Sequence, residues 1–231
     1  MELFECIEKR RSVRRFTDEP VDKLSMKKAF EAAILAPNSS NMQTWDFFWV
    51  RSDEKKKKLV EYCLSQSAAR TAQELVVISA DPALWRRSNP EVIKYVHEVD
   101  APKPVKLYYE KIIPMSYRWG LFNIFYPFKW LLQFFVGLAR PITRKPLSKR
   151  DLQEVAIKSA ALAAENFVLA LQAEGYSTCM MEGLDEWRVK KLLGLNCSSR
   201  IVMAIGIGKE GEKSLWGPRF RIGYEKVVHE V

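Results

Sequence analysis

The segment PNSSNMQTWDFF, residues 37–48, joins an apolar helical pattern to an aromatic strand pattern. Pro37 disfavours helix at the residue before it. The next four residues are small and polar, so they can turn the backbone and direct N–H, hydroxyl and amide groups outward. These four are Asn38, Ser39, Ser40 and Asn41. The loop suits hydrogen bonding to a flat polar ligand, although an ordinary connection between a helix and a strand has the same composition.

Helical and strand patterns surround this loop. Apolar residues recur at helical spacing in residues 2–9 and 22–35, and Asp22 is a candidate N-cap for the second helix. We expect its apolar stripe to face the core, with Leu24, Met26, Ala29, Phe30, Ala33 and Ile34. Strands are predicted at residues 45–50, 75–80, 175–181 and 200–206, and further helices at 53–64, 151–174 and from Asp185 to 193. The helix at 151–174 is apolar on most sides, so we expect it to be buried.

Length and composition indicate a globular protein. The chain has 231 residues, of which 48% are hydrophobic, enough for a full core. Its four cysteines are far apart and it has two histidines, so we expect no metal site and no disulfide scaffold. The N-terminus resembles no signal peptide. These features favour a cytoplasmic location.

The net charge of +9 is concentrated in one part of the chain. Residues 101–150 contain ten Lys or Arg and one Asp or Glu, together with eleven of the 27 aromatic residues. A lysine run at residues 55–58 lies beside acidic residues and accompanies no recognition motif, so we expect no nucleic-acid binding. The excess charge therefore belongs to a basic, aromatic insert.

Three further motifs accompany the loop that begins at Pro37. RRSVRRF at residues 10–16 offers arginines, which bind phosphate in a planar bidentate geometry, and the hydroxyl of Ser12. MMEGLD at 180–185 follows a predicted strand, and its glycine allows close approach of a ligand to the backbone. RFR at 219–221 adds two alternating arginines near the end of the chain.

Together the four motifs resemble the FMN-dependent nitroreductase family, over residues 2–80 and 151–231. The resemblance implies an α+β fold with a central, mostly antiparallel sheet flanked by helices, and an intertwined homodimer with sites at the subunit interface. We predict a single nitroreductase-like domain over residues 1–231, with the basic aromatic insert at about 85–150.

The resemblance also implies the cofactor contacts. Arg10 and Ser12 match positions that hold the FMN phosphate, and Arg14 matches the position that reaches the ribityl chain and pyrimidine edge. Glu182 and Gly183 would offer main-chain N–H groups to the flavin N5 edge, so no side chain is expected to be catalytic. The full expected cofactor-binding set is Arg10, Arg11, Ser12, Arg14, Pro37, Asn38, Ser39, Asn41, Gln66, Glu182, Gly183, Arg219 and Arg221.

The insert has more than one interpretation. Residues 119–139 are long and apolar, but Pro127, Lys129 and Gln133 interrupt them, which disfavours a membrane span. An interfacial segment would place aromatic residues at the headgroups of a lipid surface and give peripheral membrane contact. A lid would lay the same side chains over the ligand. We favour a lid or a dimer-capping element, with Tyr108, Trp119, Phe122 and Phe125 as its contacts.

The expected function is that of an FMN-dependent oxidoreductase with NAD(P)H as electron donor. Electrons would pass through the flavin to a small, aromatic or electron-poor acceptor in a ping-pong cycle. Reductive dehalogenation, alkene reduction and flavin degradation by members of the same family are alternatives. A membrane-surface binding module that uses the basic aromatic insert is a further alternative.

Overall fold

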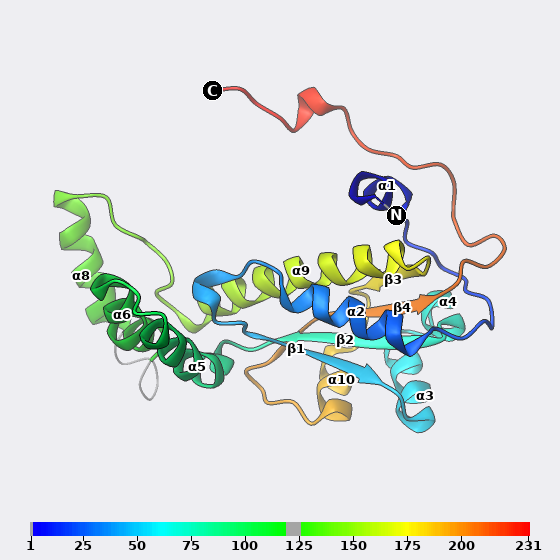
Figure 1. The fold of residues 1–231 in the computed structure, drawn as a ribbon, viewed down its shortest axis with the longest axis horizontal. Helices are drawn as coiled ribbons and strands as arrows, with labels where there is room; N and C mark the ends of the chain where they lie inside the picture. The colour runs from blue at the N-terminus through cyan, green and yellow to red at the C-terminus, as the bar shows by residue number, and fades with distance from the viewer. Residues whose placement is uncertain (1, 119–125) are drawn as a thin grey trace.

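The computed structural model describes residues 2–118 and 126–231, which fold around a four-stranded sheet (Figure 1). The strands lie in the order β1-β2-β4-β3, and each neighbouring pair is antiparallel. Their bounds are β1 Trp45–Val50, β2 Glu74–Ala80, β3 Ser177–Met181 and β4 Arg200–Gly208. A parallel bridge from Ser12 to Thr178 adds the N-terminal segment beside β3. The expected mostly antiparallel sheet is confirmed.

Helices cover both faces of the sheet because the strands are apolar on both sides. Val76 and Ile78 of β2 pack with α2 (Lys23–Ile34) and α9 (Lys149–Ala173). The alternate residues Leu75 and Val77 pack on the other face, since successive side chains of a strand point to opposite sides. The helices of that second face are α3 (Asp53–Tyr62), α4 (Ser67–Thr71) and α10 (Glu186–Leu193). The molecule is therefore layered helix, sheet, helix.

The second face depends on a glycine in the central strand β4. A Cβ atom at Gly206 would lie 2.9 Å from the carbonyl oxygen of Ala68 in α4, closer than such atoms approach. Glycine therefore allows α4 to pack directly on the strand.

Local sequence signals determine the ends of the two helices on the first face. Asp22 accepts a hydrogen bond from the Ser25 amide and begins α2, as expected. Ser148 and Asp151 form a capping box at the start of α9. The expected helices and strands are all present, with ends shifted by a few residues.

Two expectations about burial are wrong for the single chain. Leu24 and Ile34 of α2 are 59% and 52% exposed, because Met26, Ala29 and Ala33 make the contact with α9 and the sheet. The long helix α9 buries one side only, and its Leu162 is half exposed on the other. Both helices therefore present apolar side chains outward.

The insert forms a group of helices at one end of the molecule (Figure 1). Their bounds are α5 Trp85–Glu98, α6 Lys103–Leu107, the π-helix η3 Tyr108–Ile112, α7 Ile113–Tyr117 and α8 Tyr126–Ala139. A separate apolar cluster joins this group to the body through Trp85, Tyr117, Met42 and Leu152. Met42 belongs to the polar loop at residues 37–44, so the insert packs directly against that loop.

Two further features of the fold concern the length of the helices and the path of the C-terminal segment. Within the described residues, no helix is both long and apolar enough to pass through a membrane. After β4 the chain runs back past α1 (Leu3–Lys9) and extends away from the sheet (Figure 1). This C-terminal segment exposes Phe220, Tyr224 and Val227.

Candidate functional site: a pocket of converging arginines

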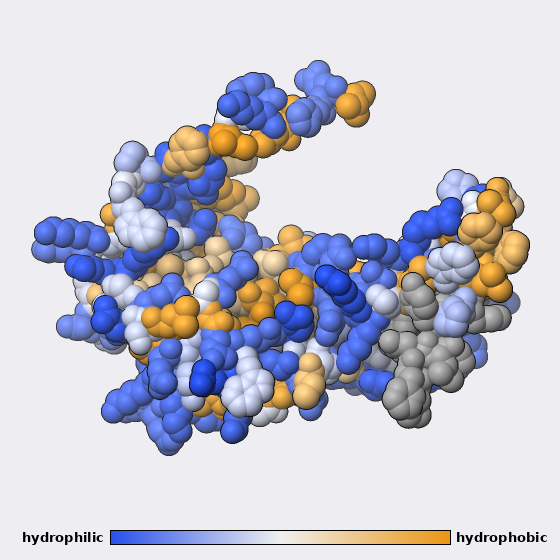
Figure 2. Space-filling model, turned by 180° about the vertical axis from the view of Figure 1, so that it is seen from behind, coloured by the Kyte–Doolittle hydropathy of each residue, from blue (hydrophilic) through white to orange (hydrophobic). Residues whose placement is uncertain are grey.

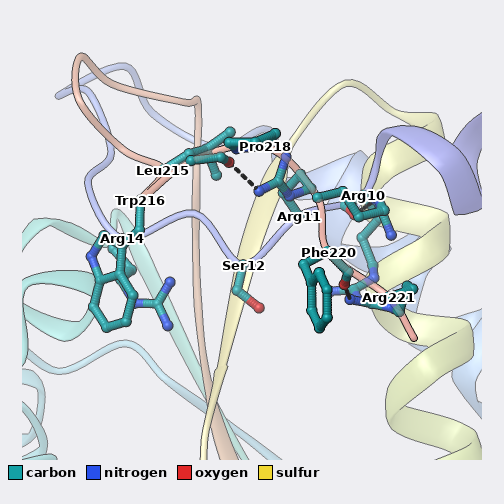
Figure 3. A pocket seen from close by; sticks show the side chains of 11 residues that line it. Arg10, Arg11, Ser12, Arg14, Leu215, Trp216, Pro218, Phe220 and Arg221 are labelled. Atoms are coloured by element: carbon teal, nitrogen blue, oxygen red, sulfur yellow. Dashed lines mark hydrogen bonds between the residues drawn. The ribbon is translucent and has the colours of Figure 1, made fainter. Parts of the chain in front are cut away.

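A pocket of about 440 Å³ lies between the segment that follows α1 and the segment that follows β4. Figure 3 shows Ser12 between the Arg14–Trp216 pair on one side and Phe220 with Arg221 on the other. The lining residues are Arg10, Arg11, Ser12, Arg14, Leu215, Trp216, Gly217, Pro218, Arg219, Phe220 and Arg221. Two motifs about as far apart as the chain allows thus form one site.

The pocket has two walls, residues 10–14 and residues 215–221, and backbone hydrogen bonds hold the first wall in position. The Val13 amide donates to the Thr178 carbonyl oxygen of β3, and the Arg14 amide donates to the Ser214 carbonyl oxygen, both at 3.0 Å. Val13 is buried in the apolar cluster that contains Leu75 and Val77. Because side chains alternate along an extended segment, burial of Val13 turns Ser12 and Arg14 the other way.

Side chains tie the second wall to the first. Arg11 Nη2 donates to the Gly217 carbonyl oxygen at 2.7 Å, the bond drawn in Figure 3. Arg219 Nη2 donates to the carbonyl oxygens of Glu8, at 2.7 Å, and Arg10. The Arg14 guanidinium lies 3.7 Å from the centroid of a Trp216 ring in a cation–π contact. The C-terminal segment is therefore held by the residues that line the pocket.

The pocket is strongly positive because five guanidinium groups and no carboxylate line it. Arg10 has an acidic neighbour outside the pocket, since its Nε lies 3.8 Å from Glu165 Oε1. Partial desolvation and then the like charges of Arg221, Arg11 and Arg10 lower the pKa of Arg219. A bound anion would relieve this repulsion and accept bidentate hydrogen bonds, while Ser12 offers a hydroxyl. The residues fit a phosphate group.

The positive field reaches the underlying strand. Burial raises the pKa of the Cys179 thiol in β3, while the charges of Arg14 and Arg10 lower it. Burial is the larger effect, so the net shift of the pKa is upward, away from the reactive thiolate form.

The polar loop is an ordered structure of its own. Asn38 Oδ1 accepts from the Gln43 amide at 2.8 Å, and the Ser39 amide donates to Ser159 Oγ of α9 at 3.3 Å. Ser40, Asn41 and Gln43 have φ values of 55°, 55° and 45°, which is uncommon for residues other than glycine. Strained backbone that its surroundings hold in place is typical of ligand-binding loops.

One insert residue reaches this loop. Tyr108, at the start of η3, places its hydroxyl 2.6 Å from Ser40 Oγ. A π-helical turn is itself frequent at functional sites. The lid contacts Trp119, Phe122 and Phe125 lie outside the described residues, so Tyr108 is the one expected lid residue that the structure places.

Gln66 holds the turn after β3. Its Nε2 donates to the carbonyl oxygens of Gly183 at 2.7 Å and Cys63 at 3.0 Å. The amide nitrogen thus fixes the position of Gly183 next to Glu182. A direct contact from Gln66 to a flavin stays a prediction.

The structure brings together only part of the expected set. Arg10, Arg11, Ser12, Arg14, Arg219 and Arg221 share the pocket. The residues at 37–41 and the Glu182–Gly183 turn do not line it, and in Figure 1 the loop lies beside the insert, away from α1. Trp216 and Phe220 were missed, because an aromatic residue in a segment without periodicity carries no signal of its own.

Known proteins are similar to this chain in sequence. A sequence model described as "Nitroreductase family" matches residues 7–209. The chain belongs to the nitroreductase family. Protein DrgA of Synechocystis sp. is 28% identical over 213 residues, which are 92% of this chain and 86% of DrgA. MhqN of Bacillus subtilis, assigned as an NAD(P)H nitroreductase, is 26% identical over 99% of this chain and 97% of its own.

A solved structure has the same fold. A protein from Exiguobacterium sibiricum that is assigned as a nitroreductase, crystallised in complex with FMN, aligns with a TM-score of 0.74 and 20% identity. The alignment covers 100% of this chain and 98% of that one. The nitroreductase fold expected from the sequence is confirmed. The enzyme class expected from the sequence is that of this family. The expected cofactors agree with the relatives, since the description of MhqN names NAD(P)H and the Exiguobacterium sibiricum structure contains FMN.

Proposed function

We propose that the protein is an FMN-dependent oxidoreductase that takes electrons from NAD(P)H and delivers them to a small, electron-poor acceptor. The observation that carries the proposal is the pocket of five arginines and Ser12, whose charge and donors suit the FMN phosphate. Arg10, Ser12, Arg219 and Arg221 would hold that phosphate. Bound FMN supplies the chemistry of accepting and releasing hydride, which divides the reaction into two half-reactions with alternating substrates.

Two further residues would support the cofactor. Arg14, held against Trp216, presents a fixed positive charge that would favour an anionic form of the isoalloxazine. Gln66 holds the Gly183 carbonyl oxygen and so restrains the turn whose Glu182 and Gly183 N–H groups would face the flavin. The role of these residues would therefore be to bind and orient the cofactor.

A visible absorption spectrum tests the proposal directly. The purified protein should be yellow and should bleach when NAD(P)H is added under nitrogen. A colourless protein that takes up no added FMN would rule out the oxidoreductase function.

We propose that the site is completed by a second copy of the chain. The residues of the loop and those of the arginine pocket are expected to touch one ligand, yet they lie apart within one chain. The single chain also leaves apolar residues exposed on α1, α2, α9 and the C-terminal segment. A homodimer that pairs these surfaces would cover the apolar residues and bring Asn38, Ser39 and Asn41 of one copy to the pocket of the other.

The dimer predicts a strong effect at Leu162. Replacing this half-exposed residue of α9 by arginine should weaken dimerisation by about 2–4 kcal/mol, because an unpaired charge would be buried. Light scattering coupled to size-exclusion chromatography measures the change. Val99→Arg, at an exposed apolar position after α5, is the matched control and should leave the dimer intact. An unchanged dimer in Leu162→Arg would contradict this interface.

The lid predicts a smaller effect at Tyr108. Tyr108→Phe keeps the ring but removes the hydroxyl that meets Ser40 Oγ at 2.6 Å. A net hydrogen bond contributes about 0.5–1.5 kcal/mol, so kcat/KM for the acceptor should fall about 2- to 10-fold while FMN content stays constant. Trp187→Phe, at an exposed position of α10 that lines neither the arginine pocket nor the loop, is the control. Equal kcat/KM in both variants would remove Tyr108 from the acceptor site.

A further inference from the structure

Helix α8 carries an exposed apolar surface on the end of the molecule away from the arginine pocket. Its outer side chains follow one broad stripe, and each is between 44% and 71% exposed: Trp130, Leu131, Leu132, Phe134, Phe135 and Leu138. Trp130 and Phe134 stack at 5.6 Å between ring centroids. Figure 2 shows apolar side chains gathered at this end of the molecule beside hydrophilic ones. An exposed patch of this kind indicates a docking surface.

The opposite side of α8 faces the chain that follows it. Arg144 donates to the carbonyl oxygens of Gln133, at 3.5 Å, and Gly137, at 3.4 Å. A Cβ atom at Gly137 would lie 2.5 Å from Arg144 Nη2, so a larger residue there would displace the end of the arginine side chain. The return segment thus fixes which side of the helix points outward.

The segment that contains the stripe and leads from it to α9 carries charges of one sign in its sequence. Residues 126–150 contain six Lys or Arg and no Asp or Glu. Lys145 pairs with Glu154 and Asp151, but among the described residues Arg140, Lys149 and Arg150 have no ion-pair partner. A second copy that presented the same patch would meet like charge, so charge complementarity favours an anionic surface.

The dimensions fit a helix that lies on a bilayer. Fourteen residues of α-helix span about 21 Å, too short for a hydrocarbon core of about 30 Å. Trp, Phe and Leu on one side of a helix with Lys and Arg nearby are typical of helices that lie in the headgroup layer. We propose that α8 docks the protein on an anionic lipid bilayer, with Trp130, Phe134 and Phe135 in the interface. This inference does not depend on the proposed oxidoreductase function.

Flotation with vesicles tests the proposal on the full chain. Vesicles of phosphatidylcholine with about 30% phosphatidylserine should carry the protein upward, pure phosphatidylcholine vesicles should carry much less, and high salt should weaken binding. The variant Trp130→Ser/Phe134→Ser/Phe135→Ser should bind anionic vesicles about 100-fold more weakly, because three partly exposed aromatic residues lose their apolar contact. Arg140→Gln/Lys149→Gln/Arg150→Gln should lose the preference for anionic lipid.

The control is Trp187→Ser, which removes an exposed tryptophan from α10 on the other part of the molecule. It should bind anionic vesicles as the parent does. Absence of flotation by the parent, or equal flotation of the triple serine variant, would overturn the proposal. A triple serine variant that loses oligomeric state in the absence of vesicles would also overturn it, because the patch would then be an interface between copies. FMN content, measured on the same samples, keeps the outcome separate from that of the proposed function.

Discussion

Arg219→Ala/Arg221→Ala should release FMN from the protein. Both guanidinium groups line the pocket, and each charge-assisted contact contributes on the order of 1.5–3 kcal/mol. Loss of both corresponds to an increase of about 10²- to 10⁴-fold in the Kd for FMN. The purified variant should be colourless after a desalting column, and fluorescence titration with FMN should give the weakened affinity.

The two arginines also have a structural part that the experiment must separate. Arg219 donates to the carbonyl oxygens of Glu8 and Arg10, so its loss frees the C-terminal segment as well as removing a charge. Arg221 alone therefore gives the cleaner measurement. Its Nη1 donates to the neighbouring Phe220 carbonyl oxygen, so this bond stays within the C-terminal segment and does not join it to residues 8–14. Arg221→Ala should weaken FMN binding about 10-fold or more with unchanged thermal stability.

The control variant removes the same number of positive charges at a site far from the pocket in the sequence. Lys55→Ala/Lys57→Ala removes two exposed positive charges from α3 and should leave FMN bound. If both double variants retained FMN equally, the arginine pocket would not be the phosphate site, and the proposed function would lose its principal support.

The sequence predicted the elements of the fold well because their signals are local. Asp22 caps the helix that follows it, Ser148 and Asp151 begin the long helix, and Val76 and Val77 alternate between two faces. The order of the strands in the sheet, in contrast, has no local signal. It depends on pairing between segments far apart, such as Glu74 with Ile207, for which a single sequence has no signal.

The same distinction explains the site. The arginine motifs were found because charge and spacing are visible in the sequence, and the structure joins them across the length of the chain through the Arg11–Gly217 bond. The stacking of Trp216 on Arg14 was not predictable, since only the folded path of the C-terminal segment brings the two together. The exposure of Leu24 and Ile34 was missed for a related reason: an apolar stripe is wider than the contact that any one neighbouring helix makes.

Phe167→Ala should destabilise the fold more than any other single truncation proposed here. Phe167 lies in the C-terminal half of α9, fully buried, with its ring centroid 4.9 Å from Phe30 of α2 and 6.3 Å from Phe47 of β1. It thus joins the long helix to both the neighbouring helix and the edge strand. Truncation of a buried phenylalanine to alanine costs about 3–5 kcal/mol, because apolar contact is lost and a cavity is left.

For a chain of this length the loss should lower Tm by about 10 °C. Differential scanning calorimetry measures it on the protein with FMN added, and the loss of stability should appear without FMN too, because Phe167 lies in the core and outside the arginine pocket. Tyr95→Ala removes an exposed aromatic ring from α5 and should shift Tm by about 1–2 °C or less. A Phe167→Ala variant as stable as Tyr95→Ala would mean that α9 does not pack on the sheet as described, because no repacking of small neighbours such as Ala163 and Ala164 can fill the volume of a phenyl ring.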